Sequence, residues 1–260
     1  MSGLPEIVLD DLTLGYEGHP AVHHLSGRFE PGSLTAVLGP NGSGKSTLLK
    51  GISGVLKPLG GTIMHRNLRL HEIAYLPQIA EIDRSFPASV ADLVSLGLWR
   101  RRGAFAAMTG ADREAMAGAL EAVGLGGFAR RQIGTLSGGQ LQRAFFARVL
   151  LQDAKVILLD EPFAAIDERT VAELVGLLQR WHGEGRTVIA VLHDTALVRQ
   201  SFPQTLLLAR EPVAWGETAS VLTRENLMKA RRMPEAWDED APWHEGGHEH
   251  EHGAQREAAQ

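Results

Sequence analysis

The stretch Gly39–Thr47 reads GPNGSGKST, and the part from Gly39 to Ser46 fits the pattern G-x-x-x-x-G-K-[ST]. It follows an apolar run, LTAVL, and opens a helical pattern, STLLKGISG. Glycines let the backbone wrap closely, so that successive N–H groups point at phosphate oxygens, and the following helix dipole attracts anions. A glycine-rich turn that matches by chance is the alternative, and the correct flanks count against it. The stretch therefore predicts a phosphate-binding loop made of Gly39, Pro40, Asn41, Gly42, Ser43, Gly44, Lys45, Ser46 and Thr47.

Within this loop two side chains have expected tasks. Lys45 should reach the β and γ phosphates, and the Ser46 hydroxyl should bind Mg²⁺.

A second motif, KVILLDEP, places four apolar residues before Asp160 and Glu161. The two acids are therefore expected at the carboxyl end of a buried strand, where α/β folds bind ligands. Asp160 is expected to hold Mg²⁺ and Glu161 to polarise an attacking water as general base. Solvated acids that cap a strand would explain either motif alone, but explain both together poorly.

Composition narrows the class of protein. The 260 residues are 44% hydrophobic and 22% charged, with a net charge of −5 and no cysteine. No overall basic field points to nucleic acid, and disulfides and thiolate metal sites are excluded, as suits a reducing cytosol. The N-terminus lacks a secretion signal, and no window approaches the roughly 18 to 20 apolar residues that span a bilayer. Any membrane role is therefore expected to come through a partner.

The order of elements predicts an α/β fold with a largely parallel sheet, because strands and helices alternate along the chain. From about residue 79 to 150 a helical insertion is expected. Residues 1–232 are predicted to form one domain, followed by a disordered His- and Glu-rich tail over 233–260. The expected strands are 7–16, 33–39, 71–77, 156–160, 187–193 and 205–209, and the expected helices are 44–56, 88–99, 111–125, 139–151 and 168–181.

The segment LSGGQLQR, residues 136–143, lies ahead of the second motif. It resembles the signature of ATP-binding cassette (ABC) proteins, and the order of the motifs is that of the family. The resemblance implies a P-loop NTPase core with an N-terminal antiparallel β region. It also implies a head-to-tail dimer of two copies with two ATP molecules between them. In that dimer the signature residues Ser137, Gly138, Gly139 and Gln140 contact the ATP held by the other cassette.

Four further positions match the family. Gln78 matches the glutamine that approaches Mg²⁺ and the attacking water, and it shares the metal with Ser46 and Asp160. His193 matches the histidine that contacts the γ phosphate, although an isolated strand-end histidine would be the commoner reading. Asp167, at the end of AAID, resembles the loop that crosses the dimer interface. Tyr16 lies where the family stacks an aromatic ring on adenine; a strand-end core tyrosine is the alternative.

The resemblance implies an ATPase that uses ATP and Mg²⁺ and drives a separate polytopic membrane permease from the cytoplasmic face of the membrane. The segment QIAEIDRSFPASVADLVSLGLW, residues 78–99, resembles ATPases of zinc and manganese importers, with an acidic residue, Asp, Phe-Pro and V-x-D-x-V after the glutamine. An extracytoplasmic metal-binding protein is then an indirect partner. Importers of another cargo, such as haem or a siderophore, and soluble iron–sulfur assembly ATPases stay open, as does a generic insertion whose likeness is superficial.

The tail contains HEGGHEHEHG, residues 244–253. His244, His248, His250 and His252 could bind zinc weakly, because neutral imidazole is a good zinc ligand. Glycines at 246 and 247 argue against a preformed site, so binding would have to order a flexible chain. A polar solubilising tail is the alternative.

Overall fold

The computed structural model describes residues 4–78, 84–99, 107–164 and 166–232. A three-stranded antiparallel sheet has the order β2-β1-β4, and a six-stranded sheet has the order β5-β6-β7-β3-β8-β9. In the larger sheet all neighbours are parallel except β8 and β9. The strands are β1 (Glu6–Tyr16), β2 (His19–Phe29), β3 (Leu34–Leu38), β4 (Gly60–Arg66), β5 (Ile73–Leu76), β6 (Val156–Asp160), β7 (Thr187–Val191), β8 (Gln204–Ala209) and β9 (Glu211–Glu217).

Helices connect most of these strands. The phosphate loop opens α1 (Lys45–Ile52), and the region between β5 and β6 holds α2 (Val90–Ser95), α4 (Gly110–Ala122) and α5 (Gly138–Gln152). The remaining helices are α6 (Glu168–Gly183), α7 (Thr195–Ser201), α8 (Thr218–Val221) and α9 (Arg224–Arg232), with 3₁₀ turns at Leu70–Glu72 (η1), Leu96–Leu98 (η3) and Ile133–Thr135 (η4).

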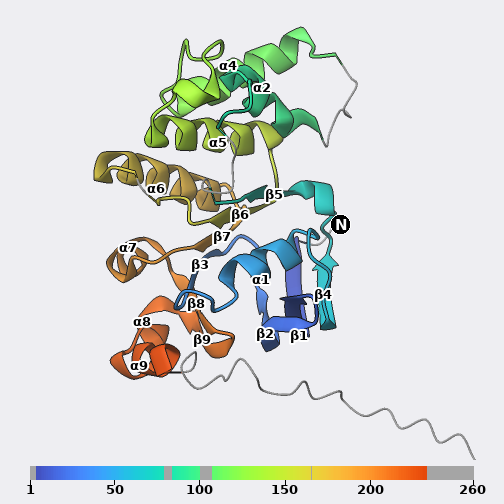
Figure 1. The fold of residues 1–260 in the computed structure, drawn as a ribbon, viewed down its shortest axis with the longest axis vertical. Helices are drawn as coiled ribbons and strands as arrows, with labels where there is room; N and C mark the ends of the chain where they lie inside the picture. The colour runs from blue at the N-terminus through green and yellow to red at the C-terminus, as the bar shows by residue number, and fades with distance from the viewer. Residues whose placement is uncertain (1–3, 79–83, 100–106, 165, 233–260) are drawn as a thin grey trace, which may run out of the picture.

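The large sheet separates two hydrophobic clusters, because alternate residues of each strand face opposite sides. In β3, Leu34, Ala36 and Leu38 join a cluster with α5, α6 and α7, whereas Val37 joins a cluster with α1, β1 and β2. The helices α5 and α6 thus cover one face, and α1 with the antiparallel sheet covers the other (Figure 1). Strand β3 is buried throughout and lies between β7 and β8. The loop that follows β3 therefore starts from the middle of the molecule.

The expected fold class is confirmed, including the parallel sheet and the antiparallel N-terminal region. The sequence did not predict β2, β4 or β9. Strand β2 reads HPAVHHLSGRF and β4 reads GGTIMHR, and neither shows a clear alternation of polar and apolar residues. Strand β9 contains Pro212 and Gly216, which weaken a strand signal and are tolerated here because β9 is an edge strand. The helix expected over 44–56 ends at Ile52, and Gly54 follows with a φ of 76°.

In the described part of the region between Gln78 and β6, the regular elements are helices joined by turns, with one isolated bridge between Ser89 and Gln132. Figure 1 shows α2, α4 and α5 gathered at one end of the molecule, beyond α6. All three helices have a hydroxyl residue as N-cap: Ser89, Thr109 and Ser137. The side chain of each N-cap accepts a hydrogen bond from the backbone N–H of the residue three positions later. The side chain of that later residue in turn accepts the backbone N–H of the N-cap. Reciprocal caps of this kind fix where each helix begins.

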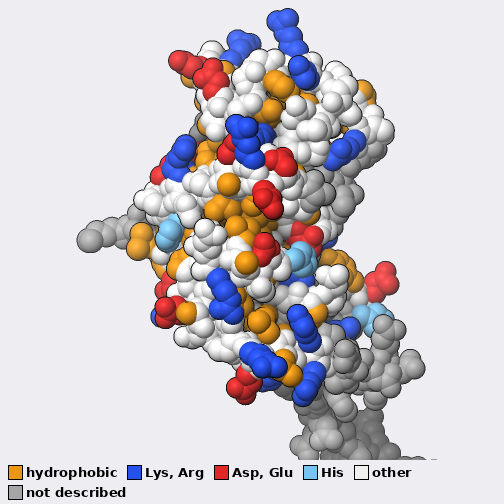
Figure 2. All heavy atoms as spheres, turned by 90° about the vertical axis from the view of Figure 1, so that its left-hand side faces the viewer, with side chains coloured by type: hydrophobic (Ala, Val, Ile, Leu, Met, Phe, Trp, Pro, Cys, Tyr) orange, Lys and Arg blue, Asp and Glu red, His pale blue; other side chains and the backbone are white. Residues whose placement is uncertain are grey.

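The surface mixes charges of both signs. Figure 2 shows Lys and Arg interspersed with Asp and Glu on the face that carries α6 and α7, with hydrophobic side chains gathered midway along it. Among the described residues no helix combines the length and the apolar character needed to cross a bilayer.

Candidate functional site

The phosphate loop is shaped by two close backbone approaches that only glycine allows. A Cβ on Gly39 would lie 1.9 Å from the Leu208 carbonyl oxygen at the end of β8. A Cβ on Gly44, which has a φ of 88°, would lie 2.4 Å from the Ala21 carbonyl oxygen in β2. The loop is further held by the Arg210 N–H, which donates to the Ser43 carbonyl at 3.1 Å. Both sheets therefore hold the loop before any ligand is bound.

Lys45 lies inside this loop and is only 6% exposed. Its Nζ donates to the carbonyl oxygens of Gly39 at 3.0 Å and Pro40 at 2.7 Å. Burial lowers the pKa of Lys45 from its ordinary value, and the carboxylates of Glu161 and Asp160 offset part of that shift. A buried ammonium group close to the loop amides is suited to a polyanionic ligand, which would supply the missing negative charge.

Ser43 gives a direct test of whether an anion fits. Its hydroxyl oxygen is buried and, among the described residues, has no hydrogen-bond partner. The same residue lines the cleft above the loop. A buried hydroxyl without a partner loses free energy, and a phosphate oxygen in the cleft would supply an acceptor. The residues present therefore fit a bound phosphate.

The second motif lies beside the loop, as expected. Strand β6 is buried along its length and delivers Asp160, which is 1% exposed. The Ser46 hydroxyl donates to Asp160 Oδ1 at 2.9 Å, and the Tyr75 hydroxyl donates to Oδ2 at 3.3 Å. The described residues hold no group of three His, Cys, Asp or Glu side chains that could bind a metal by themselves. Mg²⁺ takes few protein ligands and completes its shell with phosphate oxygens and water, so Ser46 and Asp160 fit a site that nucleotide would complete.

Glu161 and His193 face each other across the end of the sheet. His193 Nε2 lies 2.7 Å from Glu161 Oε1. Glu161 has a φ of 47°, in the left-handed region that costs a non-glycine residue free energy and that is common at functional sites. Its N–H donates to the Val191 carbonyl at 3.2 Å, and this bond ties it to the strand that precedes His193. The local fold thus fixes both side chains relative to one another.

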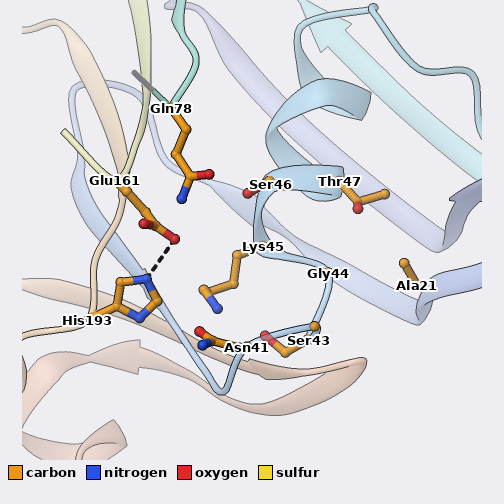
Figure 3. Close-up of a pocket in the computed structure, with 11 residues that line it drawn as sticks. Ala21, Asn41, Ser43, Gly44, Lys45, Ser46, Thr47, Gln78, Glu161 and His193 are labelled. Atoms are coloured by element: carbon orange, nitrogen blue, oxygen red, sulfur yellow. Dashed lines mark hydrogen bonds and ion pairs between the residues drawn. The ribbon is translucent and has the colours of Figure 1, made fainter. Parts of the chain in front are cut away.

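Most of these groups line one cleft of about 620 Å³, and Asp160 lies behind Ser46, off the cleft lining. Figure 3 shows Gln78 and Glu161 directed toward the space that Lys45 and Ser46 also face, with His193 closing one side. The predicted residues on its lining are Asn41, Gly42, Ser43, Gly44, Lys45, Ser46, Thr47, Gln78, Glu161 and His193. Ala21 also lines the cleft; an alanine carries no chemical signal in a sequence, and it is here because its carbonyl lies against Gly44.

The signature residues do not line this cleft. Ser137 caps α5, and its N–H donates to Gln140 Oε1 at 3.1 Å. Asp167 caps α6, where the N–H and hydroxyl of Thr170 donate to its carboxylate at 2.9 and 2.8 Å and lower its pKa. Gly139 lies against this cap, since a Cβ there would be 3.7 Å from Asp167 Oδ2. The signature and the expected interface loop therefore lie next to each other, at a separate place from the cleft.

Some of the predicted residues are not found at the cleft. Tyr16 ends β1, is 49% exposed and is not on the cleft lining, so its place beside adenine stays a prediction. Glu81, Asp83 and the four tail histidines, His244, His248, His250 and His252, lie outside the described residues.

The segment 78–99 resembles the part of the importer ATPases that is expected to dock the permease, but for Val90 and Val94 a place on a docking surface is wrong. Val90 and Val94 are fully buried. Asp92 is exposed, and it accepts the N–H and the hydroxyl of Ser89, the N-cap of α2, at 2.8 and 2.6 Å. The V-x-D-x-V part is constrained by helix packing and capping. Phe86, just before it, is 66% exposed and keeps the expected surface position.

Comparison with known proteins places the chain in a family. Residues 22–164 match the ABC transporter family. The "Probable metal transport system ATP-binding protein" of Chlamydia pneumoniae is 42% identical over 84% of this chain and 86% of its own length. The manganese transport system ATP-binding protein MntA of Synechocystis is 40% identical over 85% of this chain and 88% of its own length. The zinc transport system ATP-binding protein TroB of Treponema pallidum is 38% identical, with 86% of each chain covered.

Solved structures agree. The structure described as "An inward-facing conformation of a putative metal-chelate type ABC transporter" superposes with a TM-score of 0.78 at 31% identity, covering 88% of this chain and 89% of that chain. The dimeric structure of a bacterial ABC transporter cassette superposes with a TM-score of 0.71 at 27% identity, covering 82% and 98%. With its phosphate loop, signature segment and catalytic-type acid in the expected order, the chain belongs to the ABC transporter family, as a nucleotide-binding, ATP-hydrolysing cassette.

Proposed function

We propose that this chain is the ATP-hydrolysing subunit of a metal-ion importer, with zinc as the favoured cargo, and that it energises a separate polytopic membrane permease. The observation that carries the ATPase chemistry is the cleft in which Glu161, paired with His193 at 2.7 Å, faces Lys45 and Ser46 (Figure 3). The cargo part is supported by relatives whose names specify zinc and manganese transport.

In this mechanism the loop amides and Lys45 would hold the phosphates, while Ser46, Asp160 and Gln78 would hold Mg²⁺. The ion, when bound, offsets charge on the β and γ phosphate oxygens. Glu161 orients a water molecule and accepts its proton as the water oxygen bonds to the γ phosphorus and the bond to the ADP oxygen breaks. His193 keeps the carboxylate in place and donates toward the γ phosphate. Catalysis is then mainly positioning and charge neutralisation.

A second copy of the chain completes the site. The signature residues Ser137, Gly138, Gly139 and Gln140 would approach the ATP held by the other copy, with Asp167 at the interface between the copies. Support comes from the position of these residues outside the chain's own cleft and from the dimeric solved cassette. ATP binding would close the dimer, and hydrolysis would reopen it.

Glu161→Gln tests the chemistry. The amide cannot accept the proton, so kcat should fall at least about 100-fold, while ATP should still drive dimer formation, measured by light scattering. Glu184→Gln is a matched control, because Glu184 lies on an exposed turn and pairs with Arg186. Substantial turnover by Glu161→Gln would remove Glu161 as the base, and failure of Glu161→Gln to dimerise with ATP would argue against the shared site.

The permease would contact the end of the molecule near Gln78. Phe86, Leu96 and Trp99 are exposed hydrophobic side chains in this segment, and exposed apolar groups of this size favour contact with another protein. The cargo is tested by deleting the gene and comparing growth with zinc, manganese or iron withheld, with the wild-type chain and Glu161→Gln as complementing copies. Growth loss confined to zinc limitation supports zinc; loss confined to manganese reassigns the cargo. Loss under iron limitation, together with defective iron–sulfur enzymes, would favour an assembly ATPase.

A further inference from the structure

Tyr75 lies on β5, the edge strand of the large sheet that leads directly to Gln78. Its neighbours Ala74 and Leu76 join the cluster with α5, whereas Ile73 and Tyr75 face the cluster with α1. Asp160 ends the neighbouring strand β6 on this same face, because Val156 and Leu158 belong to the α1 cluster. Since Tyr75 pairs with Leu158 in the parallel register, its long side chain can reach along the face to Asp160.

The Tyr75 hydroxyl does reach Asp160 and donates to Oδ2 at 3.3 Å. The other oxygen, Oδ1, accepts the Ser46 hydroxyl at 2.9 Å. One buried carboxylate is thus held at both oxygens, from β5 on one side and from α1 on the other. Two such bonds restrict rotation of the carboxylate about its terminal torsion, which is otherwise broad.

The main chain of Tyr75 is itself anchored. Arg148 of α5 donates to the Tyr75 carbonyl at 2.6 Å, and Gln152 of the same helix donates to the Ile73 carbonyl at 3.0 Å. These side chains cover carbonyl groups of an edge strand that has a neighbouring strand on one side only. Ser137 of the signature segment caps α5. The helix that follows the signature therefore anchors β5, the strand whose Tyr75 contacts Asp160.

We propose that Tyr75 is a positioning residue for Mg²⁺ binding: its hydroxyl orients the Asp160 carboxylate and links that carboxylate to the strand that leads to Gln78. The inference rests on the proposed role of Asp160 at Mg²⁺. Tyr75 does not touch nucleotide in this account and is not on the cleft lining. Its effect is carried by Asp160, so it should appear in the dependence on Mg²⁺ and not in the binding of metal-free nucleotide.

Tyr75→Phe removes the hydroxyl and keeps the ring. The Mg²⁺ concentration for half-maximal ATPase should rise roughly threefold to tenfold, as expected for one lost hydrogen bond to a charged group at long range. By calorimetry, the gain in ADP affinity that Mg²⁺ gives over EDTA should shrink by the same factor, with ADP affinity in EDTA unchanged. Thr35→Val is the matched control: Thr35 is 2% exposed in a neighbouring region of the sheet, and its hydroxyl donates to Ser33.

Asp160→Asn separates this inference from the proposed metal site. If Asp160→Asn leaves both magnesium measurements at wild-type values, the metal site itself is wrong. If Asp160→Asn changes them and Tyr75→Phe does not, only the role of Tyr75 is overturned. In the double variant, Tyr75→Phe should add nothing to Asp160→Asn. A lower unfolding temperature for Tyr75→Phe with wild-type magnesium measurements would show a merely structural hydroxyl and would also overturn the inference.

Discussion

At the scale of single residues, Lys45 shows how the cleft is prepared for a ligand. Its ammonium group is almost fully buried, and burial holds its pKa below the ordinary value of 10.5. Two backbone carbonyls accept hydrogen bonds from it, and the nearby carboxylates of Glu161 and Asp160 offset part of the lowering of its pKa. The same desolvation that costs free energy in the empty cleft makes the charge more effective toward phosphate.

This arrangement gives a pH prediction with a defined sign. The folded, nucleotide-free state binds the Lys45 proton less tightly than the unfolded state. In the pH interval below 10.5 the unfolding free energy should therefore rise with pH as folded Lys45 loses its proton. Lys45→Met lacks the titrating group. The unfolding free energy of the wild-type chain minus that of the variant should therefore increase as the pH becomes alkaline. The carbonyl contacts that the variant loses add only a constant to this difference.

Urea unfolding at a series of pH values measures this difference, and other titrating groups cancel in it. The same variant should lose the stabilisation that ATP gives the wild-type chain. A difference that stays flat or falls with pH would contradict the linkage, and full ATP stabilisation of Lys45→Met would contradict the role of the lysine.

At the scale of elements, Arg143 joins three helices. From α5 it donates to the Val123 carbonyl at the end of α4 at 3.0 Å and to the Thr170 hydroxyl in α6 at 3.2 Å. It also pairs with Glu173 at 2.5 Å and lowers the pKa of that carboxyl. Because Thr170 also binds Asp167, the signature helix and the cap of α6 are connected through a single side chain.

Arg143→Lys should lower the free energy of unfolding by about 1 to 2 kcal/mol, because an ammonium group cannot bind the Val123 carbonyl, the Thr170 hydroxyl and the Glu173 carboxylate at the same time in one geometry. Arg169→Lys is the control: Arg169 contacts the same Glu173 at 3.4 Å but its side chain is 90% exposed, so little change is expected. Chemical denaturation measures both. Equal stability of the two variants would mean that Arg143 does not tie the helices together.

The central strands of the large sheet could be predicted from the sequence, whereas other strands could not. Strands β3, β6 and β7 are buried on both faces, and their continuous apolar runs in the sequence therefore predicted them. Strands β2 and β4 could not be found, because neither sequence alternates clearly between polar and apolar residues. The candidate site was found through residues at strand ends, but Ala21 and the Tyr75 contact were not, since both follow from tertiary register.

At the scale of the whole molecule, the described structure ends with α9 at Arg232. The His-rich segment therefore follows the last helix that the structure describes. Zinc binding by His244, His248, His250 and His252 stays a prediction, since imidazole favours zinc but ordering a chain costs entropy. If the tail is a weak zinc buffer, a chain ending at Arg232 should keep wild-type ATPase activity and lose zinc binding in calorimetry. Equal zinc binding by the two chains would exclude the tail, and lost ATPase activity would show that the cassette needs it.

The place of β3 in the large sheet has a consequence for how each copy is made. β3 pairs with β7 and β8, which are synthesised about 150 residues later than β3. Ribosomes add roughly 5 to 20 residues per second, so the newly made strand LTAVL waits on the order of ten seconds or more for its neighbours. Until then its apolar side chains are without their native cover, and Gly39 cannot yet dock on Leu208. While residues 39–186 are being translated, the nascent chain therefore exposes an apolar strand and lacks a complete phosphate loop with which to hold nucleotide.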